Sequence, residues 1–318
     1  MGGATTQTEI SGVCDYKAKN DEDCLDKVKE LIDKIGHFEK AGFDRKESVD
    51  SKYPASEVYQ IKPAEPSKPY NTIDLLERIV DADSMTFYKE DFGKTIICAY
   101  ARIDGWAVGI VANGREVVKS AKGEMQFGGV IYSDSADKAT RFIMNCNQKK
   151  IPLVFMHDVS GFMVDSRSEH GGIIKDGAKM VNAVSNSTVP KFSIVVGNSY
   201  GAGNYAMCGK AYDPRLILAW PTAKIAVMGG SQAAKTLLQI EKASMKAKGE
   251  VLGEKEEKEM FEKIKNRYDE QTTPYYAASR LWVDTIIDPV ETRKWISLGI
   301  EMASHSPVEK FNVGVIQT

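Results

Sequence analysis

The sequence predicts an α/β fold built on a mostly parallel sheet. From residue 153 onward, short apolar segments alternate with segments of helical periodicity, and glycine-rich turns follow several of the apolar segments. Strands that alternate with helices pair in parallel through right-handed crossovers. The chain has 318 residues, which is long for one domain but possible for a single α/β layer protein.

The first 71 residues differ from the rest of the chain. Residues 1–37 predict a small unit with one amphipathic helix over residues 21–35, whose apolar face is too small to form a core alone. We therefore expect it to pack on the main domain or on another chain. Residues 38–71 show little periodicity and contain four prolines, which predicts a linker. The main domain is expected over residues 72–318.

The first part of the main domain predicts a hairpin between two helices. Residues 73–80 read as a short helix, and two apolar strands over 94–103 and 106–112 are joined by Asp104-Gly105, a strong hairpin signal. Residues 114–129 predict a surface loop. Five apolar residues at helical spacing then predict a helix over residues 133–149: Ala136, Ala139, Phe142, Ile143 and Cys146.

The alternating part supplies the remaining elements. The expected strands and apolar segments cover residues 153–156, 192–196, 216–219, 225–228 and 283–287. The expected helices cover residues 173–185, 202–209, 231–246, 254–270, 274–282 and 291–305. The helix over 254–270 is highly charged, with Met260, Phe261 and Ile264 as its apolar stripe, which predicts a solvated surface helix.

Composition argues against several classes of function. The formal net charge is −2 and the isoelectric point about 6.2, so there is no general electrostatic case for binding nucleic acid or an anionic membrane. No apolar run reaches the roughly 18–20 residues of a membrane span, and no signal peptide is visible. Five irregularly spaced cysteines and no metal-ligand motif predict free thiols and no metal site. We expect a cytoplasmic protein, or one of the mitochondrial matrix in a eukaryote.

The strongest candidate site is the turn Gly201-Ala202-Gly203. It follows a buried-looking strand and opens a predicted helix, where backbone N–H groups and the helix dipole favour negative charge. Glycine and alanine leave room for a substrate atom to approach these N–H groups. Gly161, the pair Gly171-Gly172 and the pair Gly229-Gly230 also follow strands or open helices. In an α/β sheet such ends line one ligand-binding crevice.

The motifs disfavour the commoner chemistries at this crevice. Ser160 is not in a nucleophile elbow, and Ser199 has no evident base, so a hydrolase is weakly supported. The glycine turns match no phosphate-binding motif. His157 and Asp158 are expected to be strand-end residues satisfied by backbone groups, whereas His170 could equally line the site. Paired backbone donors suit the stabilisation of an enolate, and one such donor contributes about 3 kcal/mol in a transition state.

Residues 70–310 resemble the C-terminal domain of biotin-dependent acyl-CoA carboxyltransferases, the β subunits of methylcrotonyl-CoA, propionyl-CoA and geranyl-CoA carboxylases, and the related glutaconyl-CoA decarboxylase subunit. The resemblance rests on runs in one order: residues 101–105, 108–113, 137–143, 158–162, 171–179, 199–205 and 219–230. The tail, residues 274–282 with 287–289 and 292–293, is similar to the methylcrotonyl-CoA type.

The resemblance implies a crotonase-like (ClpP/crotonase) ββα spiral and transfer of a carboxyl group between biotin, carried on a partner protein, and an acyl-CoA. It implies that Ala202 and Gly203 donate backbone hydrogen bonds to the biotin enolate. The biotin side would be lined by Gly161, Phe162, Gly171, Gly172, Gly201 and Tyr205. The implied partners are a biotin carboxylase or biotin carrier subunit and further copies of the chain.

Two departures from the family pattern leave alternatives open. Residues 1–37 resemble only the last part of the family's N-terminal domain, so the chain should hold a biotin half-site and need an N-terminal carboxyltransferase half as partner. It is either a split subunit or a fragment. Residues 114–132 are longer than in the methylcrotonyl-CoA type and similar to the decarboxylase type. A glutaconyl-CoA decarboxylase type, a non-catalytic scaffold and a crotonase-fold hydratase remain alternatives, the last without an evident glutamate base.

Overall fold

The computed structural model describes residues 2–36, 39–120, 123–247, 253–312, 314 and 316–318. The chain forms two compact units, Met1–Lys40 and Ala41–Thr318. The first contains the short helix α1 (Gly3–Thr5), a π-helix (Thr6–Ile10) and α2 (Asp21–Ile32). Helix α2 is capped by the Asn20 side chain and confirms the predicted helix, which ends three residues earlier than expected. Its apolar face is exposed: Leu25, Val28, Leu31 and Ile32.

The second unit begins at Ala41 and includes the segment whose prolines predict a linker. Residues 41–71, here called the strap, contain a 3-10 turn (Ala55–Glu57) and helix α3 (Val58–Ile61). Ala41, Val58 and Lys62 of the strap are buried. The strap is therefore a packed part of the second unit, although few regular hydrogen bonds form within it.

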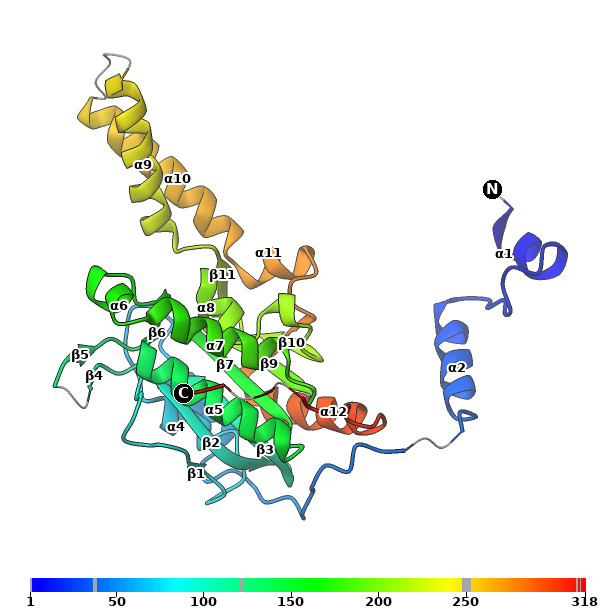
Figure 1. Ribbon diagram of the computed structural model, residues 1–318. Coiled ribbons are helices and arrows are strands. Elements are labelled where there is room, and N and C mark those ends of the chain that lie inside the picture. Colours follow the sequence, from blue (N-terminus) through cyan, green and yellow to red (C-terminus); the bar gives the residue numbers. More distant parts are fainter. Residues whose placement is uncertain (1, 37–38, 121–122, 248–252, 313, 315) are drawn as a thin grey trace. The chain divides into compact units, whose positions relative to one another are not determined.

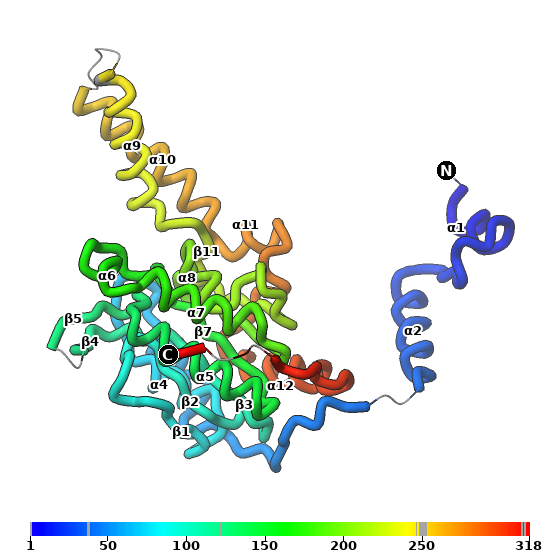
Figure 2. The backbone as a smooth tube through the Cα atoms, in the orientation of Figure 1, coloured from blue at the N-terminus to red at the C-terminus, as the bar shows by residue number. Residues whose placement is uncertain are grey.

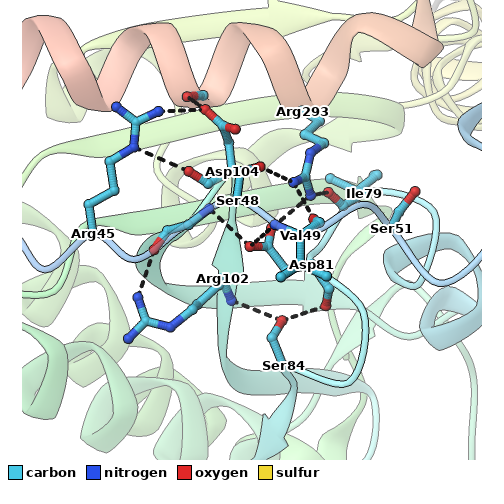
Figure 3. A network of polar contacts seen from close by, with 12 residues as sticks. Arg45, Ser48, Val49, Ser51, Ile79, Asp81, Ser84, Arg102, Asp104 and Arg293 are labelled. Atoms are coloured by element: carbon cyan, nitrogen blue, oxygen red, sulfur yellow. Dashed lines mark hydrogen bonds and ion pairs between the residues drawn. The ribbon is translucent and has the colours of Figure 1, made fainter.

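Buried Asp81 holds the first part of the strap in place (Figure 3). Its carboxylate accepts hydrogen bonds from the Gly105 amide at 2.9 Å and from Arg293 at 2.7 Å. Arg293 in turn donates to the backbone oxygen of Val49 at 2.6 Å and to the Ser48 hydroxyl at 3.1 Å. Four segments far apart in the sequence thus meet at one ion pair.

The central sheet has the strand order β1-β2-β3-β7-β9-β10-β12, and β11 also pairs with β9. Strands β1 (Thr86–Phe87), β2 and β3 are antiparallel neighbours, whereas β3, β7, β9, β10 and β12 run parallel, as predicted. The bounds of the other strands are Ile96–Ile103 for β2, Trp106–Asn113 for β3, Leu153–Val159 for β7, Lys191–Tyr200 for β9, Leu216–Ala219 for β10, Lys224–Ala226 for β11 and Thr285–Ile286 for β12.

The predicted hairpin between β2 and β3 is confirmed. Ile103 pairs with Trp106, and Asp104 and Gly105 both have positive φ, of 52° and 79°. Positive φ at both central residues is the backbone of a type I′ turn, whose twist matches that of the strands. A Cβ atom on Gly105 would lie 2.0 Å from the Lys46 carbonyl oxygen, so the turn and the strap require glycine there.

Helices cover both faces of the sheet (Figure 1). Alternate residues of β7 divide between two cores: Val154 and Met156 face one, and Phe155 and Val159 the other. Helices α5 (Ser133–Gln148) and α7 (Ile173–Ser185) pack together on the second core. Helices α4 (Thr72–Leu76) and α12 (Thr292–Ser304) supply apolar residues to the first. All five apolar residues predicted for the helix over 133–149 are buried.

Several short elements surround the ends of β7 and β9. Residues 114–129 contain the small hairpin β4 (Val118–Lys119) and β5 (Met125–Gln126) where the sequence predicts a loop. Strand β6 (Val130–Ile131) pairs in parallel with β8 (Gly161–Phe162). The other short helices of the second unit are α6 (Ser166–His170), α8 (Gly201–Ala206) and α11 (Pro274–Ser279), and 3-10 turns cover Lys210–Tyr212 and Pro289–Glu291.

Helices α9 (Gly230–Ala247) and α10 (Glu254–Gln271) form a pair that projects from the sheet (Figure 2). No described residue of α10 is buried, which confirms the solvated helix, although it packs against α9 and does not lie flat on the body. Among the described residues, no helix is long and apolar enough to cross a membrane.

Candidate functional site

The turn Gly201-Ala202-Gly203 lies closely against the end of β7 and against β8. Gly201 has a φ of +48°, and a Cβ atom on it would lie 2.9 Å from the Val227 carbonyl oxygen. A Cβ atom on Gly203 would lie 2.7 Å from Val159 Cγ2 and 3.1 Å from Gly161 Cα. Gly203 is needed because a larger residue would push α8 away from β7 and β8, and Gly201 because of its positive φ and its contact with Val227.

The same turn offers backbone donors. The first N–H groups of a helix have no partner within the helix and form the positive end of its dipole. Ala202 is exposed and Gly203 is buried, so the start of α8 lies at the boundary between core and surface. Donors fixed by packing at such a boundary suit the stabilisation of an oxyanion.

Gly161 of β8 lies next to this turn, against Gly203. Its φ is +141°, a conformation that side chains rarely adopt, and a Cβ atom on it would contact nothing within 4 Å. There is therefore open space beside Gly161, next to the start of α8. The neighbouring Phe162 is half-buried and packs on α7, because a Cβ atom on Gly177 would lie 2.8 Å from its ring. This contact fixes the position of β8.

The remaining predicted site residues line two other cavities. Gly172 begins α7 with a φ of +96°, and its neighbour Gly171 lines an open groove of about 720 Å³ together with Met163 and Asp165. Tyr205 is half-exposed and lines a smaller cavity of about 210 Å³. The structure thus brings together Gly161 and the turn at Gly201. His170, weighed as a site residue, is exposed at the end of α6.

The expectation that backbone groups satisfy His157 and Asp158 is wrong in its main point. Asp158 is buried, and its carboxylate lies 3.6 Å from Lys62 Nζ and 3.4 Å from Arg115 Nε. It also accepts a hydrogen bond from the Tyr70 hydroxyl at 3.0 Å. Only the bond from the Asn198 amide, at 2.9 Å, is of the expected kind.

His157 is also buried, and its Nδ1 lies 2.9 Å from the Ser199 hydroxyl. Burial lowers the pKa of His157 to about 4, so the ring is neutral at pH 7. This pairing of histidine and serine does not support a hydrolase function. Both side chains are fully buried, whereas a nucleophile must reach its substrate. Sequence reasoning missed these contacts because the partners lie 42 residues apart on different strands.

The described residues contain no group of three or more His, Cys, Asp or Glu side chains that could hold a metal ion. All five cysteines are free thiols, two exposed and three buried. Burial raises the pKa of Cys98 and Cys208 to about 12, so these thiols are un-ionised at pH 7.

Comparison with known proteins places this geometry in one family. The carboxyl transferase domain matches residues 1–313. The β1 subunit of biotin-dependent 3-methylcrotonyl-CoA carboxylase from Mycobacterium tuberculosis is 42% identical over 317 residues, covering 100% of this chain and 57% of that protein. The mitochondrial methylcrotonoyl-CoA carboxylase β chain of Arabidopsis thaliana is 39% identical over 323 residues, covering 100% and 53%. This chain therefore spans little more than half the length of these relatives.

Solved structures of carboxyltransferase subunits resemble this chain as well. The β subunit of geranyl-CoA carboxylase from Pseudomonas aeruginosa superimposes with a TM-score of 0.78 at 34% identity, covering 99% of this chain and 57% of that one. The transcarboxylase 12S subunit, described as a hexamer with hydrolysed methylmalonyl-CoA bound, gives a TM-score of 0.71 at 32% identity, covering 97% and 56%. With the family match running from the first residue to residue 313, this chain belongs to the carboxyl transferase domain family and has the crotonase-like α/β fold of the acyl-CoA carboxyltransferases.

Proposed function

We propose that this chain provides the biotin-side half of a carboxyltransferase site, at which a carboxyl group moves between carboxybiotin and an acyl-CoA. The observation that carries the proposal is the contact between Gly203 and Gly161, which fixes the N–H groups at the start of α8 beside open space. Family membership supports carboxyl transfer as the reaction, because the relatives named above are biotin-dependent acyl-CoA carboxylase subunits.

The residues of the turn would act through their backbone. The N–H groups of Ala202 and Gly203 would donate to the ureido oxygen of biotin, where negative charge accumulates as the carboxyl group departs. Bound carboxybiotin supplies the carboxyl group itself. Gly161, which leaves open space at its Cα, fits a flat ring close to the backbone.

The other predicted residues would border the same ligand. Phe162 would hold β8 in place through its contact with α7, and Gly201 would allow the turn into α8. Gly171, which lines the groove of about 720 Å³, and its neighbour Gly172, which precedes α7, would form the approach for the biotin arm. Tyr205 would bound the far side of α8.

Methylcrotonyl-CoA is the acyl-CoA that the comparisons favour. The relative named for that substrate is 42% identical, whereas the methylmalonyl-CoA decarboxylase α subunit of Propionigenium modestum is 34% identical over 303 residues. The β4–β5 hairpin occupies the connection whose length suggests the decarboxylase type. A decarboxylase type therefore stays as the second candidate.

The partners follow from the same proposal. A biotin carboxylase or biotin carrier subunit would present the biotin, and an N-terminal carboxyltransferase half would supply the acyl-CoA side and the other oxyanion hole. We propose that residues 1–37 correspond to the end of that N-terminal domain, and that the chain assembles with further copies, as in the hexameric transcarboxylase. A cytoplasmic or mitochondrial matrix location belongs to the same proposal, since the Arabidopsis relative is named as mitochondrial.

The decisive experiment supplies the missing half. The chain is expressed alone and together with the N-terminal half of a methylcrotonyl-CoA carboxylase β subunit, and acyl-CoA-dependent decarboxylation of carboxybiotin is measured. We expect activity only in the combined sample. Activity of the chain alone would refute the half-site, and no activity with an N-terminal half known to bind acyl-CoA would favour a scaffold.

The turn itself is tested by Ala202→Val. Ala202 is exposed, so the larger side chain obstructs the donors without disturbing the core, whereas Gly203→Val would collide with Val159 and alter the fold as well. Ala243→Val, the same change at an exposed position of α9, is the control. We expect Ala202→Val to lower the rate by about 100-fold or more, and an unchanged rate would remove the turn from the mechanism.

A further inference from the structure

We infer that a chain of hydrogen bonds, from the partly buried Asn204 through Ser199 to His157, fixes the orientation of the first turn of α8, so that these three side chains are positioning residues for the backbone donors. The inference rests on the proposed function only for its effect on rate. That these hydrogen bonds anchor the turn does not depend on the proposed function.

The contacts link three elements. Asn204 on α8 donates from Nδ2 to the Ser199 hydroxyl oxygen at 2.8 Å, and that oxygen lies 2.9 Å from His157 Nδ1. Ser199 is on β9 and His157 on β7, and both are fully buried. Asn204 directly follows Gly203, so its side chain holds the turn one residue from the proposed donor.

Chemistry fixes the direction of the first hydrogen bond, and the tautomer of His157 sets that of the second. The amide nitrogen of Asn204 can only donate, so the Ser199 oxygen accepts that bond. In the tautomer of His157 that carries its proton on Nε2, Nδ1 accepts the Ser199 hydroxyl proton. Burial keeps the imidazole neutral, with its pKa lowered to about 4, which lets Nδ1 accept that proton. In this arrangement each hydrogen-bond donor faces an acceptor, and no two donors face one another.

An irregularity between β7 and β9 brings the serine into place. His157 pairs with Val195, but Val159 pairs with Ser199, so β9 contains two more residues than β7 over this interval. Such bulges redirect side chains at the ends of strands. Here the bulge places Ser199 within reach of both His157 and Asn204.

Helix α8 would be poorly fixed without these hydrogen bonds. Helix α8 has only six residues, and helices so short depend on tertiary contacts for their position. Glycines at its start permit close packing but supply no side chain to hold it. The Asn204 side chain is the first polar side chain of the helix, and it contacts the core through Ser199.

The first test compares Ser199→Ala with Ser135→Ala in the full chain by hydrogen exchange. Both serines are fully buried, and each hydroxyl takes part in two hydrogen bonds, but both bonds of the Ser135 hydroxyl go to the backbone of Tyr132, the residue that precedes α5. The probe is the peptide covering residues 203–208, where the Met207 amide donates to the Gly203 carbonyl oxygen at 3.0 Å. We expect exchange there to become about 10-fold faster in Ser199→Ala and unchanged in Ser135→Ala. Equal exchange in the two variants would overturn the inference.

A conservative pair tests the histidine. In His157→Asn an amide oxygen can take the place of Nδ1 and accept from Ser199, whereas His157→Leu removes the acceptor. Exchange over residues 203–208 should stay within about threefold of the unmodified chain in the first variant and rise about 10-fold in the second. The same rise in both variants would exclude His157 from the chain of hydrogen bonds.

Carboxyl transfer with the N-terminal half separates this inference from the proposed function. We expect Ser199→Ala to lower kcat about 10-fold while the KM for the acyl-CoA, bound by the other half, stays within about twofold. Faster exchange with an unchanged kcat would uphold the positioning of the turn and refute its catalytic role. A proportional loss in Ser135→Ala would instead mark a general effect of stability and count against the inference.

Discussion

Replacing Asp158 by asparagine removes the negative charge that faces two buried cations. The side chains of Lys62 and Arg115 are 6% and 7% exposed, and both lie within 4 Å of the Asp158 carboxylate. Asparagine keeps the size of the residue and can still accept from the Asn198 amide. The substitution therefore isolates the charge from the shape.

The magnitude follows from what each cation retains. Arg115 keeps a hydrogen bond to the Pro66 carbonyl oxygen at 2.7 Å, whereas Lys62 keeps a longer one to the Pro63 carbonyl oxygen at 3.3 Å and its position over the Tyr70 ring, 5.2 Å from the centroid. Breaking a buried ion pair by removing one partner costs about 3–5 kcal/mol, and we expect a loss of this size in the free energy of unfolding. Most of it should come from Lys62, so Lys62→Met in the same chain should restore about 1–3 kcal/mol.

The assay is urea unfolding followed by circular dichroism, with all variants at pH 7. Asp91→Asn is the control, because Asp91 is fully exposed and its ion pair with Lys94 at 3.9 Å should contribute almost nothing to stability. Burial already lowers the pKa of Lys62, opposed by Asp158, and losing Asp158 lowers it further. The folded state of Asp158→Asn then binds fewer protons than the unfolded state, so its deficit should shrink as pH rises from 7 toward 10. A loss below about 0.5 kcal/mol at pH 7, or a double variant less stable than Asp158→Asn, would refute the reasoning.

Three further predictions concern the strap, the hairpin and the buried histidine. Arg293→Met should lower the free energy of unfolding by about 2–4 kcal/mol and expose residues 45–51 to limited proteolysis, because Asp81 and the strap lose their shared partner; unchanged cleavage there would contradict the anchor. Gly105→Ala should cost more than about 2 kcal/mol in thermal unfolding, whereas Gly123→Ala, also at positive φ but in open space, should cost clearly less. The folded-state pKa of His157 is about 4 against 6.5 when unfolded, so the unfolded state binds more protons between these values and stability should fall by about 3 kcal/mol as pH drops through that window. His157→Asn should remove this part of the pH dependence, and an unaltered pH profile would argue against it.

The parts of the fold that sequence predicts well are those set by local pattern. The hairpin at Asp104-Gly105 needs positive φ at both residues, which few other pairs provide, and the structure has it in the predicted register. Helix α7 covers residues 173–185 as predicted, and β10 covers residues 216–219. Periodicity identifies such elements because the buried face of each repeats within a few residues.

The strap and the polar interior could not be predicted in this way. Prolines indicate where regular hydrogen bonds are missing, but they do not reveal that Lys62 and Tyr70 extend to a carboxylate 88 residues beyond Tyr70. Likewise, Ser199 and His157 belong to strands whose pairing is irregular, so even a correct sheet would not place them together. Such contacts depend on tertiary geometry, for which a single sequence carries no periodic signal.

The alternation of β7 connects the two buried polar groups. Successive residues of a strand face opposite sides of the sheet, and Val154 and Met156 share one core with Tyr70, whereas Phe155 and Val159 share the other with Met207. Asp158 accordingly contacts Tyr70 and Lys62 of the strap, and His157, its neighbour, contacts α8 through Ser199. Both make these contacts where the pairing of β7 and β9 is irregular, immediately before Gly161. Shifting this strand by one residue would therefore exchange the two side chains and break both anchors together. This interdependence explains why a site whose donors are backbone groups still depends on particular side chains beneath it.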